Sequence, residues 1–550
     1  MAPVIVPASY PRCIAATVFA LAIALSAPEA VQGATFTVNT TIDEVDAFPG
    51  DGICDDGESK CALRAAIMET NALPGRDTVN VAAGHYTLTI PLAIGDSAAH
   101  GDLNVSDDLE IVGAGATATV IEMGDIPDRV FQVRQGVNVV ISETTITGGG
   151  HALASGAGIS NSGGLTLNEV VIRDNLGRSG GGISNNGTLA VNGGAFIHNV
   201  ARGTHGRAGA ISNFGFLFLK GVTFEENGAN GGGAVSNLGV ATMENVTMND
   251  NSSSIGEGGA ISNWFELTVT GSDISGNRGG IGGGIHNDYL ATLSVSNSTI
   301  SDNRGGGVRN RWGTVTLTNV TVAENISEAG PRGVYNDLSE PPTCNVCRSS
   351  AFETGTVILR NTIVANNVGG DCGGGPGAIT SAGHNLSSDE SCGFTAAGDM
   401  QNVDPLLGPL ARNGGPTQTQ ALLAGSPAID AGNPLACPAS DQRGVVRPID
   451  GDDDGSAACD IGAYEAPTLT PTASSTASAS PSPGPTMTAT ATPPPTASPA
   501  LLPPGGGANA RGGSGWWVAI AAGAVLSVAM GAALRTRRPE FPNTPNAPSR

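Results

Sequence analysis

Gly158-Ile159-Ser160-Asn161 is the first copy of a four-residue phrase that occurs eight times in the chain. The other copies are Gly182-Ile183-Ser184-Asn185, Ala210-Ile211-Ser212-Asn213, Ala234-Val235-Ser236-Asn237, Ala260-Ile261-Ser262-Asn263, Gly284-Ile285-His286-Asn287, Gly307-Val308-Arg309-Asn310 and Gly333-Val334-Tyr335-Asn336. Their asparagines follow one another at intervals of 24, 28, 24, 26, 24, 23 and 26 residues. A repeat of this length is typical of a solenoid, in which each unit buries its apolar face only against the next unit.

The residues between these phrases predict β-strands. Apolar residues alternate after each asparagine, as at Leu165 and Leu167, and again in a second run, as at Val170 and Ile172. Such alternation indicates strands, and no part of the period has the 3.6-residue spacing of a helix. Three short strands per period predict an all-β fold, a parallel β-helix over residues 126–400. The stretch resembles the pectate-lyase-like superfamily, which implies a right-handed, single-stranded solenoid, here of about ten coils.

Composition limits the partners of this solenoid. The 550 residues include 80 glycines, 14% charged residues and only 4% aromatic residues, and the formal net charge is -23. The length is too great for one compact domain. Because an acidic surface repels polyanions, nucleic acid and anionic membrane surfaces are not expected as partners.

The first 34 residues have the pattern of an export signal, in which Arg12 precedes an apolar run and then small residues. Export favours disulfides, and the eight remaining cysteines fall into close pairs. The predicted pairs are Cys54 with Cys61, Cys344 with Cys347, Cys372 with Cys392, and Cys437 with Cys459. A zinc site or a redox-active pair at Cys344 and Cys347 is the alternative for that loop.

Residues 35–125 are expected to begin the solenoid. A strand at 35–39 and an acidic loop precede a helix near 63–72, which is predicted to cap the open end of the stack. The motifs are Phe36-Thr37-Val38-Asn39, Cys61-Ala62-Leu63-Arg64 and Ile67-Met68-Glu69-Thr70-Asn71-Ala72. They resemble the CSLREA domain of bacterial surface proteins. That family has Ser and Glu where this chain has Ala62 and Ala65, and both positions are expected on the helix surface.

Residues 401–465 are expected to close the solenoid at its other end. Their motifs are Asp404-Pro405-Leu406-Leu407, Gly425-Ser426-Pro427-Ala428-Ile429-Asp430-Ala431-Gly432, Asp441-Gln442-Arg443-Gly444 and Cys459-Asp460-Ile461-Gly462-Ala463-Tyr464-Glu465. They resemble the choice-of-anchor Q domain, which implies a bacterial envelope protein.

A calcium loop is predicted inside this region. Asp450, Asp452 and Asp454 occupy positions 1, 3 and 5 of the loop, and Gly455 occupies position 6. Ile461 stands at position 12, where a glutamate is usual, and Asp460 beside it is the nearest carboxylate. A solvated acidic turn without metal is the alternative.

The C-terminal segments predict a membrane anchor. Residues 466–515 are rich in Pro, Thr, Ser, Ala and Gly, a composition that stays extended and is expected to form a disordered stalk. Residues 516–534 carry no charge and are followed by three arginines, as in a transmembrane helix with a cytoplasmic tail at 535–550. The chain is therefore expected at the bacterial cell surface, held by one C-terminal helix.

A candidate ligand site follows from two changes along the repeat. The position before the coil asparagine is serine in five copies and then becomes His286, Arg309 and Tyr335, and it is expected to face solvent. Aromatic residues gather just after the asparagines, at Phe214, Trp264, Phe265, Tyr289 and Trp312. The predicted ligand-binding residues are Trp264, His286, Tyr289, Arg309, Trp312 and Tyr335, as a surface for sugar rings. The alternative is an aromatic stack that only shields the turn.

No catalytic residues are assigned from the sequence. Carboxylates such as Asp288 and Asp302 recur at no shared place on adjacent coils, and Arg309 and Arg311 show no acidic cluster beside them. The prediction is adhesion, carbohydrate contact or envelope structure, with carbohydrate or another cell-surface protein as partner. The alternatives are a polysaccharide lyase or glycoside hydrolase acting on acidic or plant-type glycans, and a structural spacer without a ligand.

Overall fold

The computed structural model describes residues 33–93, 97–150, 155–203, 206–254, 257–280, 282–327, 332–337, 355–374 and 378–468. The chain divides into one unit at residues 1–473 and a second at 474–550, and only the first contains described residues. The export signal, the loop of Cys344 and Cys347, the stalk and the predicted membrane helix all lie outside those ranges. Within them, no helix has the length and apolarity needed to cross a membrane.

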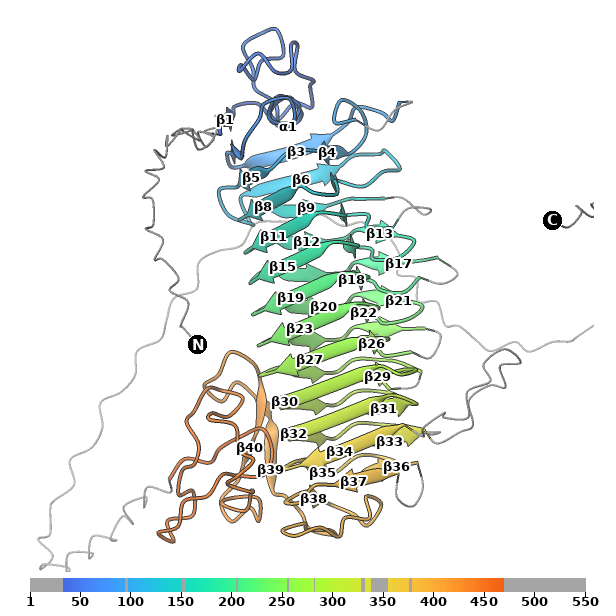
Figure 1. Ribbon diagram of the computed structural model, residues 1–550, viewed down its shortest axis with the longest axis vertical. Coiled ribbons are helices and arrows are strands. Elements are labelled where there is room, and N and C mark those ends of the chain that lie inside the picture. Colours follow the sequence, from blue (N-terminus) through green and yellow to red (C-terminus); the bar gives the residue numbers. More distant parts are fainter. Residues whose placement is uncertain are drawn as a thin grey trace, which may run out of the picture. The chain divides into compact units, whose positions relative to one another are not determined.

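The repeated phrase forms an eleven-stranded parallel sheet (Figure 1). Its strands pair in chain order and in register, so that Ile159, Ser160 and Asn161 lie beside Ile183, Ser184 and Asn185. The strands are β4 (Leu103–Val105), β7 (Phe131–Val133), β10 (Ile159–Asn161), β14 (Ile183–Asn185), β18 (Ile211–Asn213), β22 (Val235–Asn237), β26 (Ile261–Asn263), β29 (Ile285–Asn287), β31 (Val308–Arg311), β33 (Val334–Asp337) and β36 (Cys372–Gly373). Each coil of the chain therefore adds one strand to this sheet.

A second, 23-stranded sheet has two bands of parallel strands. The first band contains β1 (Thr35–Val38), β2 (Asp77–Val81), β5 (Leu109–Val112), β8 (Asn138–Ser142), β11 (Gly164–Asn168), β15 (Thr188–Asn192), β19 (Phe216–Lys220), β23 (Val240–Glu244), β27 (Glu266–Thr270), β34 (Thr356–Arg360) and β37 (Ile379–Ser381). The second contains β3 (Gly84–Leu88), β6 (Thr119–Met123), β9 (Thr145–Thr147), β12 (Val171–Arg173), β16 (Ala195–Ile197), β20 (Thr223–Glu225), β24 (Thr247–Asn249), β28 (Asp273–Ser275), β35 (Ile363–Ala365) and β38 (Leu386–Ser387). Two long strands, β30 (Thr292–Ser301) and β32 (Thr314–Ala323), run through both bands.

Short strands complete the coils in the middle of the stack. They form a four-stranded sheet of β13 (Leu176–Gly177), β17 (Val200–Ala201), β21 (Gly228–Ala229) and β25 (Ser252–Ser253). The parallel β-helix of about ten coils predicted from the repeat is thus confirmed.

Columns of like residues hold the coils together. Inward Ile, Val and Leu side chains form one continuous apolar core, within which Phe196 and Phe224 stack with ring centroids 4.9 Å apart. Buried asparagines form ladders, as where Asn161 Nδ2 donates to Asn185 Oδ1 at 2.7 Å and the amide of Asn185 donates to Asn213 at the same distance. The ladders satisfy polar groups at the coil corners that would otherwise be buried without partners.

The helix α1 (Leu63–Thr70) lies against β1, β2 and β4, at the N-terminal end of the stack (Figure 1). The Arg64 guanidinium is fully buried, and its Nε lies 2.6 Å from Asp43 Oδ1. Glu69 accepts hydrogen bonds from the backbone N–H groups of two residues of the acidic loop, at 2.5 Å each. Ala62 and Ala65 are fully buried, so the expectation that they lie on the helix surface is wrong. The helix packs against these strands on one side, and Glu69 links it to the acidic loop.

Residues 401–468 do not close the stack as expected but lie along its flank. They form an antiparallel pair, β39 (Leu407–Ala411) and β40 (Thr419–Leu422), and irregular loops, and their apolar side chains share a small core with Ile363, Ala365 and Leu386 of the β-helix. The Asn297 amide donates to Ser440 O at 2.8 Å, and Thr299 Oγ1 donates to Gln442 Oε1 at 2.7 Å. Asn297 and Thr299 belong to β30 of the 23-stranded sheet, which we call the long sheet. Residues 401–468 therefore dock on polar side chains of this sheet. We call residues 401–468 the flanking region.

Three of the four predicted disulfides are confirmed. They join Cys54 to Cys61, Cys372 to Cys392 and Cys437 to Cys459, with Cα–Cα distances of 5.1, 4.7 and 6.4 Å. The first fixes the acidic loop beside α1, and the last ties together two loops of the flanking region. The pair at Cys344 and Cys347 lies outside the described residues and stays a prediction.

Candidate functional site

Aromatic side chains follow one corner of the β-helix, where the eleven-stranded sheet turns into the long sheet. Phe214, Phe265 and Tyr289 expose 46%, 54% and 40% of their surface, whereas Trp264 is half-buried and Trp312 is buried. We call these five residues the aromatic edge. They come from four coils, because each stands one or two residues after a coil asparagine.

At the later end of the aromatic edge the rings contact one another. Tyr289 and Trp312 meet edge to face with centroids 6.2 Å apart, and the Arg311 guanidinium lies over the Trp312 ring at 4.1 Å. A stack of this kind holds the rings in fixed orientations. The structure therefore brings Trp264, Tyr289 and Trp312 of the predicted site to one corner.

The position before the coil asparagine is buried in the middle coils, contrary to expectation, whereas Ser160, Arg309 and Tyr335 at its two ends are half-buried. Ser212, Ser236 and Ser262 are fully buried, and His286 is only 3% exposed. Loops rich in glycine lie directly over this column. A Cβ on Gly258 would stand 1.8 Å from Ile261 O, and the Gly258 N–H donates to Ser262 Oγ at 3.1 Å. Only residues without side chains fit there, so the loops cover the small serines closely.

In the later coils larger polar residues replace the serines and the residues beside them. His286, Arg309 and Tyr335 lie side by side in one column, and their neighbours on the other side of the coil asparagines are Asp288, Arg311 and Asp337. We call these six residues the polar grid. The Arg309 and Asp337 side chains form a salt bridge, and Arg311 Nη1 lies 4.0 Å from Asp288 Oδ2.

A further carboxylate, Glu257, belongs to the loop above the polar grid. Burial raises its pKa, and the nearby Asp288 carboxylate raises it further. Burial likewise raises the pKa of Asp288. His286 shows the opposite shift, because burial and the charges of Arg309 and Arg311 lower its pKa to about 3. Its ring nitrogens have no hydrogen-bond partner among the described residues, so the imidazole is neutral at physiological pH.

The polar grid agrees with the sequence arguments against a catalytic carboxylate pair but adds contacts that they did not include. Arg309 and Arg311 each pair with one carboxylate, and Asp288 and Asp337 share one place in the repeat but are separated by the coil of Arg311. The signal was present in the sequence, since Asp288, Arg311 and Asp337 directly follow a coil asparagine. Glu257 lies in a loop of variable length, and its place above the grid could not be found from spacing.

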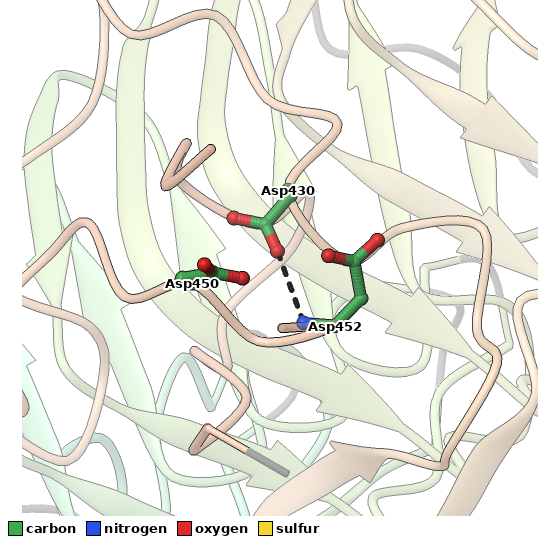
Figure 2. A group of neighbouring side chains, drawn as sticks. All are labelled: Asp430, Asp450 and Asp452. Atoms are coloured by element: carbon green, nitrogen blue, oxygen red, sulfur yellow. Dashed lines mark hydrogen bonds between the residues drawn. The ribbon is translucent and has the colours of Figure 1, made fainter. Parts of the chain in front are cut away.

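A group of neighbouring carboxylates is present at the predicted calcium loop, but its members differ from the four residues predicted. Oxygens of Asp430, Asp450 and Asp452 lie within 4.8 Å of one another, and Figure 2 shows these side chains gathered around the same loop. We call them the acidic triad. One oxygen of Asp430 accepts hydrogen bonds from the N–H groups of Gly451 and Asp452 at 2.9 and 3.3 Å. Asp450 Oδ1 is buried without a partner among the described residues, so it remains available to a cation. Such an all-oxygen set suits calcium.

Asp454 and Asp460 do not join the acidic triad. Asp454 Oδ1 accepts the Ser456 N–H at 2.8 Å, within its own turn. Asp460 is fully buried, and one of its carboxylate oxygens accepts the Asp430 N–H at 2.8 Å. Burial and the neighbouring Glu465 raise its pKa to about 7. Asp430 was missed because it lies 20 residues before the loop in the sequence.

No protein-family model matches the chain, and no curated protein matches it in sequence. Among solved structures it is similar to pectate lyase Pel9A, with 16% identity and a TM-score of 0.37 over 79% of this chain and 97% of the lyase. The A-module of a mannuronan C-5 epimerase, AlgE6 of Azotobacter vinelandii, gives 17% identity and a TM-score of 0.34 over 64% of this chain and 91% of the module. These values are too low to bear on the activity of this chain.

Proposed function

We propose that this protein contacts carbohydrate at the cell surface through its aromatic edge. The observation that carries the proposal is the group of exposed rings at one corner, with Phe265 and Tyr289 on adjacent coils and Phe214 two coils earlier, in a chain with only 4% aromatic residues. Exposed apolar patches of this kind mark interaction sites more often than chance. Tyr289, which is held by its edge-to-face contact with the buried Trp312, offers an exposed apolar face at little cost in conformational entropy.

A glycan array on the purified protein tests this proposal. Wild type is expected to bind a subset of glycans, and Tyr289→Ala with Phe265→Ala is expected to weaken that binding at least tenfold. Phe48→Ala is the matched control, because Phe48 is 74% exposed but belongs to the N-terminal loop. Absence of glycan binding by wild type, or equal binding by all variants, would contradict the proposal and favour a spacer or a protein-binding surface.

The polar grid favours a second candidate, a polysaccharide lyase or glycoside hydrolase. Glu257 and Asp288 have raised pKa values close to a neutral imidazole and two arginines, as groups that exchange protons in catalysis often do. The test is release of reducing or unsaturated ends from the glycans that bind. Glu257→Gln is expected to abolish release if the grid is catalytic. Release that persists in this variant would exclude the role of Glu257.

We also propose that the chain is exported, displayed on the stalk at 466–515 and anchored by the helix at 516–534. The CSLREA and choice-of-anchor Q resemblances support a bacterial envelope protein, and α1 is then the cap of the stack. The acidic triad is proposed as a calcium site that fixes the flanking region. Fractionation of cells after removal of residues 516–550 tests the anchor, since the shortened protein is expected in the medium rather than in the membrane.

A further inference from the structure

A groove lies on the outer face of the long sheet, next to the aromatic edge. Its volume is about 660 Å³, and it crosses three coils in the early part of the stack. The side chains and backbone that line it include Asn138, Ser162, Gly163, Thr166, Thr188 and Ala190. Hydroxyl, amide and small apolar groups therefore alternate along its floor.

A row of glycines follows the coil corner beside this groove. Gly163, Gly187, Gly215 and Gly239 occupy the same place on four successive coils. A Cβ on Gly187 would stand 2.0 Å from Gly163 O, and a Cβ on Gly239 would stand 2.1 Å from Gly215 O. Side chains are thus excluded over four coils. The row ends where Phe265 takes the corresponding place on the next coil.

Phenylalanines stand at the later end of the groove. Phe216 and Phe218 lie on the coil that follows Thr188 and Ala190 and are in register with them, at the strand spacing of about 4.8 Å. The two phenylalanines expose 53% and 47% of their surface. Phe214 on the same coil is exposed as well. A ligand that lies in the groove and runs along the stack therefore contacts aromatic rings at the later end of the groove.

The backbone around the groove excludes a peptide strand as the ligand. β11 pairs with β8 on one side and with β15 on the other, and β15 pairs onward with β19. No unpaired strand edge is present among these strands, so a peptide finds no template for main-chain pairing. Side-chain hydroxyls and amides beside aromatic rings instead suit the hydroxyl groups and apolar ring faces of sugars.

Charge selects among glycans. Among the described residues that line the groove, Arg76 alone is ionisable, and its guanidinium lies 3.5 Å from Glu110. The net charge of -23 repels anionic polymers from the molecule as a whole. We infer that the groove binds a neutral, unbranched glycan that runs along the coil axis and stacks on Phe216 and Phe218. This inference rests on the proposed carbohydrate contact and specifies its ligand.

Isothermal titration of the full chain with a neutral β-1,4-linked hexasaccharide, and with a polyuronate hexamer of equal length, tests the inference. Thr188→Lys places a long charged side chain in the groove at an exposed position, so folding is not at risk. Thr314→Lys is the matched control, since Thr314 is exposed in the same outward column, five coils later. The neutral hexasaccharide is expected to bind at least tenfold more weakly to Thr188→Lys and to Phe216→Ala, and equally well to Thr314→Lys.

Two results would overturn the inference. One is neutral-glycan binding that Thr188→Lys leaves unchanged, and the other is tighter binding of the polyuronate than of the neutral hexamer. Glycan binding that depends on Tyr289 but not on Thr188 would overturn the groove alone and leave the aromatic edge as the site. Absence of binding to any glycan would overturn both.

Discussion

The Arg447 guanidinium lies 3.1 Å from the Glu465 carboxylate, and both side chains are fully buried. Arg447 also donates to Asp460 O and Gly462 O at 2.7 and 2.8 Å, and Glu465 accepts the Ile449 N–H at 2.8 Å. The ion pair and these hydrogen bonds therefore tie the irregular segment at 460–465 to the loop at 447–449. Loss of one partner would leave a buried charge without compensation.

Arg447→Ala is expected to lower the free energy of unfolding by about 3–5 kcal/mol, because the Glu465 charge then lacks its partner. Arg173→Ala is the matched control. Arg173 and Asp174 form an exposed pair at 2.6 Å, and loss of such a pair costs about 0–1 kcal/mol. Urea unfolding of both variants measures the difference. Equal effects would show that the buried pair contributes no more than a surface pair.

The asparagine ladder gives a second prediction. Asn237 accepts from Asn213 at 2.7 Å and donates to Asn263 at 2.9 Å, all three being fully buried. Asn237→Ala removes the donor to Asn263 Oδ1 and one acceptor of the Asn213 amide, and it is expected to cost about 1–3 kcal/mol.

Asn192→Ala provides the control for the ladder, since Asn192 donates to Asn168 on the preceding coil at 3.0 Å in an exposed Asn–Asn pair. Water replaces that partner, so its effect is expected to be under about 1 kcal/mol. Thermal unfolding of the two variants compares them. A similar loss in both would mean that burial does not strengthen the ladder.

Asp273 predicts a pH dependence of stability. It is fully buried in β28, and the nearby Ser275 hydroxyl only partly offsets the loss of solvent around its carboxylate. Burial, with the nearby Asp302, raises its pKa from 3.8 to about 7. The folded state therefore holds a proton that the unfolded state releases between these values. Stability should fall as pH rises through this window, by at most about 4 kcal/mol.

Asp273→Asn should remove this part of the pH dependence, because an amide does not titrate. The variant is expected to unfold at higher urea than wild type at pH 8 and to lose that advantage near pH 4. A smaller slope remains from Asp460, whose pKa is also raised to about 7. Parallel pH profiles for wild type and variant would contradict the raised pKa of Asp273.

The fold could be predicted because the repeat is visible residue by residue. One coil asparagine on each turn sets the register, so Ile159, Ile183 and Ile211 stack as their spacing implies. The disulfides followed in the same way from local cysteine pairs. The solvent exposure of the serine column could not be predicted. Glycine-rich loops cover this column, and their path depends on contacts between coils.

The candidate site was predicted only in part for the same reason. Tyr289 and Trp312 share a place in the repeat, two residues after the coil asparagine, and Trp264 stands one residue after its own, so the sequence places them at one corner. Glu257 and Asp430 reach their sites through loops of irregular length, which periodicity does not place. The position of the flanking region differs most from the prediction. Its docking on Asn297 and Thr299 joins residues more than 140 positions apart in the sequence, which the repeat does not encode.

The acidic triad gives the last prediction. Calcium is expected to raise the unfolding temperature of wild type, and a chelator to reverse this, because a ligand that binds only the folded state stabilises it. Asp450→Asn should abolish the shift by removing a ligand whose Oδ1 has no other partner among the described residues. Asp454→Asn should retain it, since Asp454 binds within its own turn. A shift that survives Asp450→Asn would place the cation elsewhere, and no shift in wild type would leave a solvated acidic turn.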